Sequence, residues 1–157
     1  MSRSLRIASL TLLLLATFAL GACGGSNDVD KKNAYVRELN TAQSNFKADA
    51  DELTRRAVPR APAGKVRFVE RFGTAIDQVV AKLRGIKVPG EVRAEHQQLI
   101  NVMTGFGGDI RQTALAMGAG DARRIGAAQR TFKTAQDAAG VRINAAIAAI
   151  NSKLAGT

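Results

Sequence analysis

Hydrophobic residues recur at spacings of three and four along four long stretches of this sequence. That spacing places them on one face of an α-helix. The second stretch is the clearest, with a regular repeat of Val69, Phe72, Ile76, Val79 and Leu83. No stretch alternates apolar and polar residues over the length of a strand, so the pattern predicts an all-α fold.

The four stretches predict helices over about residues 30–57, 65–84, 90–117 and 121–154. Prolines and glycines separate them, because a proline has no amide to donate and disfavours helix at the residue before it. Pro59 and Pro62 mark the first turn, and Pro89 marks the second. Asp121 is the expected N-cap of the last helix, since its carboxylate can accept hydrogen bonds from free backbone amides.

The connections between these stretches are short, and short connections make successive helices antiparallel neighbours. The predicted architecture is therefore an up-down-up-down four-helix bundle over residues 30–157. Folding the chain at its turns places Phe106 opposite Phe132 and Phe46 near Ile76.

The N-terminus has a different composition. Residues 1–22 start with Arg3 and Arg6, continue with an uncharged run of 14 residues over 7–20, and end on two small residues. This layout is typical of a secretory signal peptide. A helix that crosses a bilayer needs about 20 apolar residues, so the run is short for a permanent span and is expected to be cleaved off.

The signal ends on Leu20-Gly21-Ala22-Cys23, which resembles at every position the lipobox of bacterial lipoproteins. The resemblance implies that the lipoprotein signal peptidase recognises Leu20, Gly21 and Ala22 and cuts between Ala22 and Cys23. It also implies that the Cys23 thiol receives a diacylglyceryl group and that the new amino group can be acylated. Apart from this covalent lipid, no cofactor is expected.

By the same resemblance, the lipid holds the protein on the extracytoplasmic face of a cell membrane. Gly24 stands where an inner-membrane retention signal would have Asp, which favours the outer membrane in an organism that has one. Residues 23–29 have no apolar periodicity and are predicted to form a flexible tether. The helical part is similar to the many small helical bacterial lipoproteins that have no assigned activity.

The chain is strongly basic. Its formal net charge is +10, and removal of Arg3 and Arg6 with the signal leaves +8. A basic domain on a tether is expected to attract anionic lipid headgroups or an anionic envelope polymer, and a generally solvated basic surface is the alternative. Nucleic acid is not an expected partner, because few aromatic residues follow Cys23 and the periodicity places most of them in the core. The sequence indicates no particular protein partner.

His96 is the only histidine and falls on the inner face of the third predicted helix, between Val92 and Leu99. Buried polar groups normally find a partner, so the simplest interpretation is a half-buried histidine bonded to a backbone carbonyl or to water. A lone metal ligand and a pH-sensitive contact are the alternatives.

The same helix contains Gly105, Phe106, Gly107 and Gly108. Three glycines inside a helix cost roughly 1 kcal/mol each relative to alanine, so their presence needs a reason. Close approach of a neighbouring helix, a kink, or a ligand notch that also includes His96 would each supply one.

The motifs of catalysis and metal binding are absent from the sequence. A di-iron bundle needs Glu-x-x-His pairs and a covalent haem needs Cys-x-x-Cys-His, and neither pattern occurs. A lipid on Cys23, the only cysteine, leaves no thiol for a disulfide or a zinc site. We therefore expect a non-enzymatic, metal-free binding or structural module at the cell envelope. The alternative is a small-molecule sensor or carrier with a pocket between helices near Gly105 and Gly108.

Overall fold

The structure is a computed structural model and describes residues 26–55, 61–119 and 122–156. These residues form α1 (Ser26–Arg55), α2 (Pro62–Gly85), the short 3-10 helix η1 (Gly90–Val92), α3 (Arg93–Gly118) and α4 (Ala122–Ala155). No strand occurs within the described ranges. The all-α four-helix bundle predicted from the sequence is confirmed.

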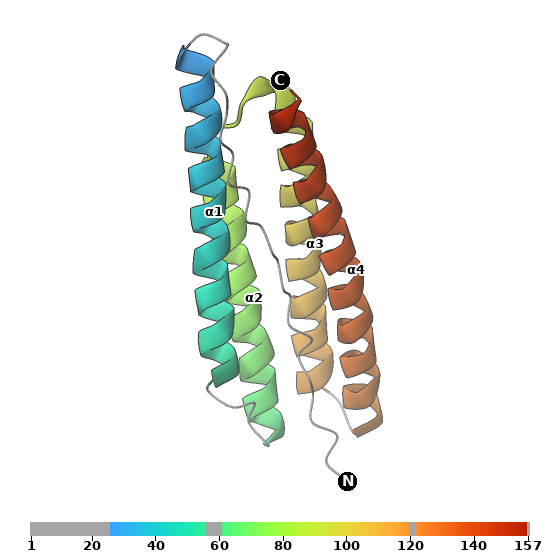
Figure 1. The fold of residues 1–157 in the computed structure, drawn as a ribbon. Helices are drawn as coiled ribbons and strands as arrows, with labels where there is room; N and C mark the ends of the chain where they lie inside the picture. The colour runs from blue at the N-terminus through green and yellow to red at the C-terminus, as the bar shows by residue number, and fades with distance from the viewer. Residues whose placement is uncertain (1–25, 56–60, 120–121, 157) are drawn as a thin grey trace.

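Successive helices run in opposite directions along one long axis (Figure 1). The start of α1, the connection from α2 to α3 and the end of α4 lie together at the end drawn uppermost in Figure 1, which we call the upper end. The end of α1, the start of α2, the end of α3 and the start of α4 form the lower end. The predicted up-down-up-down order is therefore present.

Helix α1 starts earlier than its periodicity predicts, at Ser26. Asp28 lies in its first turn and accepts a hydrogen bond from the Lys31 ammonium at 3.0 Å. An acidic side chain in the first turn stabilises a helix N-terminus, because it faces the positive end of the helix dipole. The last four residues of the tether predicted over residues 23–29 therefore belong to α1.

Helix α2 also starts earlier than predicted, at Pro62 instead of near residue 65. Proline suits the first position of a helix, because its backbone torsion is already helical and its missing amide would have no partner there. The backbone of Ala61 is extended, and its carbonyl accepts from the Lys65 amide at 3.1 Å. Pro62 therefore begins the helix and is not part of the turn.

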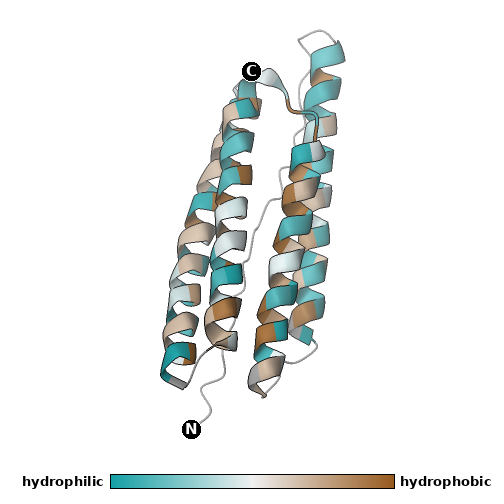
Figure 2. Ribbon diagram, turned by 180° about the vertical axis from the view of Figure 1, so that it is seen from behind, coloured by the Kyte–Doolittle hydropathy of each residue, from teal (hydrophilic) through white to brown (hydrophobic). Residues whose placement is uncertain are grey.

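Each helix turns a hydrophobic face inward, and Figure 2 shows polar and apolar positions alternating along every helix. The largest fully buried side chains come one from each helical element: Tyr35, Ile76, Val92, Ile110 and Ile150. None of the helices in the described ranges is both long and apolar enough to cross a membrane.

Four phenylalanine rings meet inside the bundle, one from each long helix. We call Phe46, Phe72, Phe106 and Phe132 the phenylalanine cluster. The ring centroid of Phe72 lies 6.2 Å from that of Phe46, 6.2 Å from that of Phe106 and 6.4 Å from that of Phe132. These separations are those of interacting aromatic pairs. Phe72 therefore connects its own helix to the other three.

The phenylalanine cluster bears on both contacts predicted from the turns. The Phe106 ring stacks on the Phe132 ring at 6.3 Å, which confirms the first prediction. The ring that meets Phe46 belongs to Phe72, one helical turn before the predicted Ile76. The contact of Phe46 with Ile76 stays a prediction.

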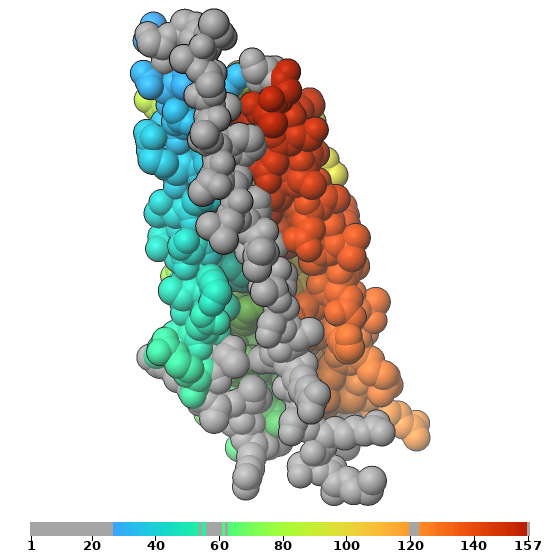
Figure 3. Space-filling model, viewed as in Figure 1, coloured from blue at the N-terminus to red at the C-terminus, as the bar shows by residue number. Residues whose placement is uncertain are grey.

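The helices do not all pack on their neighbours to the same extent. Within the described ranges, extensive contacts join α1 to α2, α2 to α3 and α3 to α4, whereas α1 and α4 share no such interface. On the face shown in Figure 3, α1 and α4 form the two edges. Both helices keep hydrophobic side chains that are only partly buried: Val36, Leu39, Phe46, Phe132 and Ile143. Helix α1 is therefore held mainly by α2.

Replacing Phe72 by alanine is expected to lower the free energy of unfolding by about 3 kcal/mol, because its ring touches three other helices. Urea unfolding followed by circular dichroism measures this loss. Leu115→Ala is the control, since the Leu115 side chain is 66 % exposed. The control should change the unfolding free energy by less than ~0.5 kcal/mol. Equal losses in the two variants would contradict the central position of Phe72.

Candidate functional site

His96 lies at the upper end with 3 % of its surface exposed, more deeply than the half-buried position predicted. Its Nε2 atom is 2.9 Å from the carbonyl oxygen of Leu83, in the last turn of α2. Its Nδ1 atom is 3.0 Å from the hydroxyl oxygen of Tyr35, in α1. One side chain of α3 is thus bonded to both α1 and α2.

These two partners determine the tautomer of neutral His96. A backbone carbonyl can only accept, so Nε2 carries the hydrogen and donates it to Leu83. Nδ1 then has a free lone pair and accepts from the Tyr35 hydroxyl. The predicted bond to a backbone carbonyl is present. A metal ion could reach His96 only by displacing Leu83 or Tyr35.

Tyr35 is 1 % exposed, and its ring meets the His96 ring edge-on with centroids 5.5 Å apart. Burial raises the pKa of the Tyr35 hydroxyl above its usual value, and the negative charge of Glu95 raises it further. The hydroxyl therefore keeps its proton at neutral pH. It remains the hydrogen-bond donor that Nδ1 of His96 requires.

Glu95 precedes His96 in the first turn of α3 and reaches α4. Its Oε1 atom accepts from the Lys153 ammonium at 2.7 Å, and its Oε2 atom is buried with no hydrogen-bond partner among the described residues. The hydrogen bond from Lys153, followed by one from its own backbone amide, lowers the pKa of Glu95, and burial opposes this shift. The acid lies at the start of one helix and the cation at the end of another, where the helix dipoles favour each charge.

A second ion pair at the upper end joins α1 to η1, because Nζ of Lys32 lies 3.3 Å from Oε1 of Glu91. The side chains with these contacts form what we call the upper polar cluster: Lys32, Tyr35, Glu91, Glu95, His96 and Lys153. Together with the Leu83 carbonyl, the cluster connects all four long helices at one end of the bundle.

The glycine segment lies within α3, which continues without a break from Arg93 to Gly118. Phe106 points into the core, where it is 5 % exposed and belongs to the phenylalanine cluster. His96 precedes Gly105 by nine residues of the same helix, which corresponds to roughly 14 Å along its axis. The structure therefore does not bring His96 together with the glycines as one site.

The three glycines of this segment have different surroundings. A Cβ atom added to Gly107 would lie 3.3 Å from Cγ2 of Ile76 on α2, closer than ordinary side-chain contacts. A Cβ atom added to Gly105 or Gly108 would have no atom within 4 Å. Close approach of a neighbouring helix thus accounts for Gly107 and for neither of the other two glycines.

The contact at Gly107 has a counterpart on the opposite helix. A Cβ atom added to Gly73 of α2 would lie 3.2 Å from Cγ2 of Ile110 on α3. On each of the two helices, a glycine therefore packs against an isoleucine side chain of the other helix. Such small positions allow two helix backbones to approach closely.

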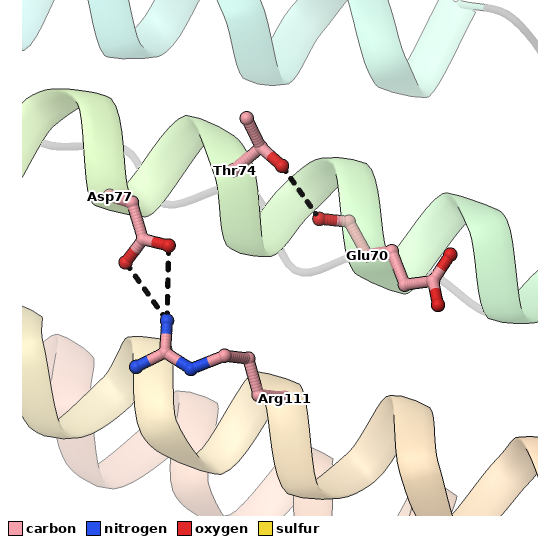
Figure 4. A network of polar contacts seen from close by, with 4 residues as sticks. All are labelled: Glu70, Thr74, Asp77 and Arg111. Atoms are coloured by element: carbon pink, nitrogen blue, oxygen red, sulfur yellow. Dashed lines mark hydrogen bonds and ion pairs between the residues drawn. The ribbon is translucent and has the colours of Figure 1, made fainter.

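Beside Gly107, the Arg111 side chain reaches across from α3 to α2. Its Nη1 atom is 3.0 Å from each carboxylate oxygen of Asp77 (Figure 4). Both side chains are more than half exposed, so the pair contributes at most ~1 kcal/mol to stability. On the same stretch of α2, the Thr74 hydroxyl donates to the Glu70 carbonyl at 3.2 Å (Figure 4). The Asp77–Arg111 pair lies at the solvent-facing border of the α2–α3 interface, whereas the Thr74 hydrogen bond stays within α2.

Other predicted residues cannot be placed. Leu20, Gly21, Ala22 and Cys23 lie outside the described residues, as does Asp121, the predicted N-cap of α4. Their roles stay predictions.

Among the residues that the structure describes, no three His, Cys, Asp or Glu side chains are grouped as a metal site would need. The sequence matches no known family model, and comparisons with curated proteins and with solved structures find no match either. Function therefore has to be inferred from the residues of this chain.

Sequence reasoning did not find the partners of His96. The periodicity places Tyr35 on a hydrophobic face and says nothing of its hydroxyl. A buried tyrosine hydroxyl usually needs a partner, and this need is the signal that could have found the pair. Folding the chain near Pro59 and near Pro89 brings Tyr35, Leu83 and His96 to one level.

Alanine at Gly105 or at Gly108 is expected to raise the free energy of unfolding by about 0.5–1 kcal/mol, because helix propensity improves and no neighbouring atom is displaced. Alanine at Gly107 should stabilise less or should destabilise, because the new methyl group would press on Ile76. Urea unfolding of the three single variants measures these effects. Equal stabilisation at all three positions would contradict the close contact at Gly107.

Acidification is expected to remove the stabilisation that the Glu95–Lys153 pair supplies. The pKa of Glu95 in the folded protein lies below its ordinary value of 4.5, so the unfolded chain takes up the proton first. The contribution is complete above that ordinary value and disappears as the pH falls through the lower, folded-state value. Asp28, whose pKa the hydrogen bond from Lys31 lowers, adds to the same loss.

Between about pH 6 and pH 3, the free energy of unfolding should therefore fall less in the Glu95→Gln variant than in the wild-type protein. Urea unfolding at several pH values measures this slope, with Lys153→Gln as the matched variant from the other side of the pair. The idea fails if the unmodified protein and Glu95→Gln show the same slope.

Proposed function

We propose that this protein is a lipid-anchored, extracytoplasmic helical module that works by binding or by structural support, without catalysing a reaction. The observation that carries the proposal is Leu20-Gly21-Ala22-Cys23, which matches the lipobox at every position and follows an uncharged run typical of a secretory signal. Cys23 is also the only cysteine in the chain.

The physical chemistry of such an anchor is simple. A single acyl chain gives weak and reversible membrane attachment, whereas two chains on one residue hold firmly. A diacylglyceryl group on Cys23 carries two chains. Attachment then needs no spanning helix and leaves the helical bundle outside the bilayer.

The contacts of His96, the only histidine in the chain, support a non-catalytic role. His96 has one ring nitrogen bonded to the Leu83 carbonyl and the other to the Tyr35 hydroxyl. Both ring nitrogens are therefore engaged in hydrogen bonds that join α3 to α1 and α2. The alternative of a small-molecule sensor or carrier stays a prediction, since the surroundings of Phe106 and Gly107 are those of packed helices.

Changing Cys23 to alanine is expected to remove the lipid and to prevent cleavage after Ala22. In a bacterial host that processes lipoproteins, the wild-type protein should be found in the detergent-soluble membrane fraction. Its N-terminal peptide should carry the mass of a diacylglyceryl cysteine. The variant should lack that mass, and any chain that stays with the membrane should retain residues 1–22.

Cys23→Ser is the conservative companion variant, because serine preserves size and polarity but has no thiol to form the thioether. Both variants should behave alike. If the N-terminal peptide of the wild-type protein carries no lipid mass, the proposal is overturned.

A further inference from the structure

We infer that the upper end of the bundle lies against the anionic headgroups of the membrane, held there by four exposed cations: Lys82, Arg84, Lys87 and Arg93. The inference rests on the proposed lipid on Cys23, and goes beyond it by assigning the surface that faces the bilayer. The partner is a lipid surface that contains anionic headgroups.

Chain length restricts which end of the bundle can reach the membrane. Only Gly24 and Gly25 separate Cys23 from Ser26, where α1 begins. A fully extended chain spans at most about 3.6 Å per residue, so the three steps from Cys23 to Ser26 cover roughly 11 Å. An acylated Cys23 therefore keeps the start of α1 close to the headgroups.

The fold places the connection from α2 to α3 at the same end as the start of α1 (Figure 1). Two contacts across the bundle agree with this arrangement. Lys32 of α1 pairs with Glu91 of η1 at 3.3 Å, and Tyr35 of α1 bonds to His96 of α3 at 3.0 Å. The start of α1 extends some two turns beyond these contacts, so a tilt of the bundle brings the α2–α3 connection to the surface.

The charges at this connection are predominantly positive. The stretch over residues 82–93 contains four cations, all exposed and none in an ion pair with another described residue. Its single acid, Glu91, is already paired with Lys32 of α1. Of the neighbouring acids, Glu95 and Asp28 are paired with Lys153 and Lys31. Asp30, near the start of α1, is exposed and has no ion pair with another described residue, so the four cations outnumber the single unpaired acid. The four cations are thus available to an external anionic surface.

The expected contact is electrostatic and not hydrophobic. The exposed large hydrophobic side chains on the described surface are Leu115 and Val141, and neither belongs to the upper end. Basic residues next to a membrane are attracted by the negative potential of anionic lipids, and the attraction falls off within one Debye length. That length is about 8 Å at physiological salt.

The lower end provides an internal comparison. The lower half of the bundle also has four cations with no ion pair among the described residues: Lys65, Arg67, Arg71 and Arg130. Arg71 is the nearest to the upper set, eleven residues before Lys82 on α2 and therefore roughly 17 Å from it along the axis. Helix α3, with 26 residues, separates the two ends by roughly 39 Å. Even the roughly 17 Å between Arg71 and Lys82 is about two Debye lengths, so an anchor at Cys23 brings the upper set much closer to the lipid than the lower set.

Two single cysteines can report the orientation, because lipidation consumes the thiol of Cys23. Gly90→Cys places a fluorophore at the upper end and Gly118→Cys places one at the lower end. Both glycines are exposed, and a Cβ atom at either would meet no atom within 4 Å. The lipidated proteins are reconstituted into vesicles of phosphatidylcholine, with or without about 30 mol% phosphatidylglycerol. A nitroxide on the lipid headgroup quenches fluorophores near the surface.

Phosphatidylglycerol is expected to increase quenching at Gly90→Cys by about twofold or more and to leave Gly118→Cys unchanged. Salt at about 1 M should abolish the increase without any further substitution. Changing the four upper cations to glutamine should abolish it as well. The same change at the four lower cations removes equal charge and should have no effect. Thermal unfolding of both quadruple variants verifies that they are folded.

The mass of the N-terminal peptide separates the two ways in which the inference can fail. A Cys23 without lipid overturns the proposed anchor and this inference together. A lipidated Cys23 with equal quenching in the two vesicle types, or with an increase that only the lower cations control, overturns the inference alone. Quenching at Gly90→Cys that responds to a soluble polyanion but not to phosphatidylglycerol would instead assign this end to an envelope polymer.

Discussion

The buried imidazole of His96 imposes the most demanding constraint on this bundle. Both ring nitrogens lie away from water, and an unpaired polar atom in that position would cost about 1–3 kcal/mol. One partner is the Leu83 carbonyl and the other is the Tyr35 hydroxyl. Hydrogen bonds tolerate far less displacement than apolar contacts do. The relative heights of α1, α2 and α3 at the upper end are therefore set by one side chain.

Farther from the upper end, the helices are held together mainly by side-chain packing. Gly73 and Gly107 each accept an isoleucine from the facing helix, so α2 and α3 approach more closely than larger residues would allow. The phenylalanine cluster then fills the centre of the bundle, with Phe72 in contact with rings from three helices. The two kinds of contact are complementary, since the glycines bring backbones together and the phenylalanines occupy the space that remains.

Helical periodicity was sufficient to predict the fold class, the four helices and the Phe106–Phe132 contact, because each depends on regular spacing and short turns. It was insufficient for the start of α2, where Pro62 acts through its local backbone preference. Nor could periodicity find the polar contacts at the upper end. The bonds from His96 to Tyr35 and from Glu95 to Lys153 join residues far apart in sequence, and their geometry exists only once the helices are packed.

The one-sided packing of α1 has a mechanical consequence if the proposed lipid on Cys23 tethers the chain at its N-terminus. A pull between membrane and domain enters along the axis of α1, which is packed extensively on α2 but not on α4. Because the two helices are antiparallel, such a force loads their interface in shear. The ties nearest the tether are the Lys32–Glu91 ion pair and the Tyr35–His96 hydrogen bond. Tension from the anchor would thus be borne first by polar bonds and only afterwards by the apolar core.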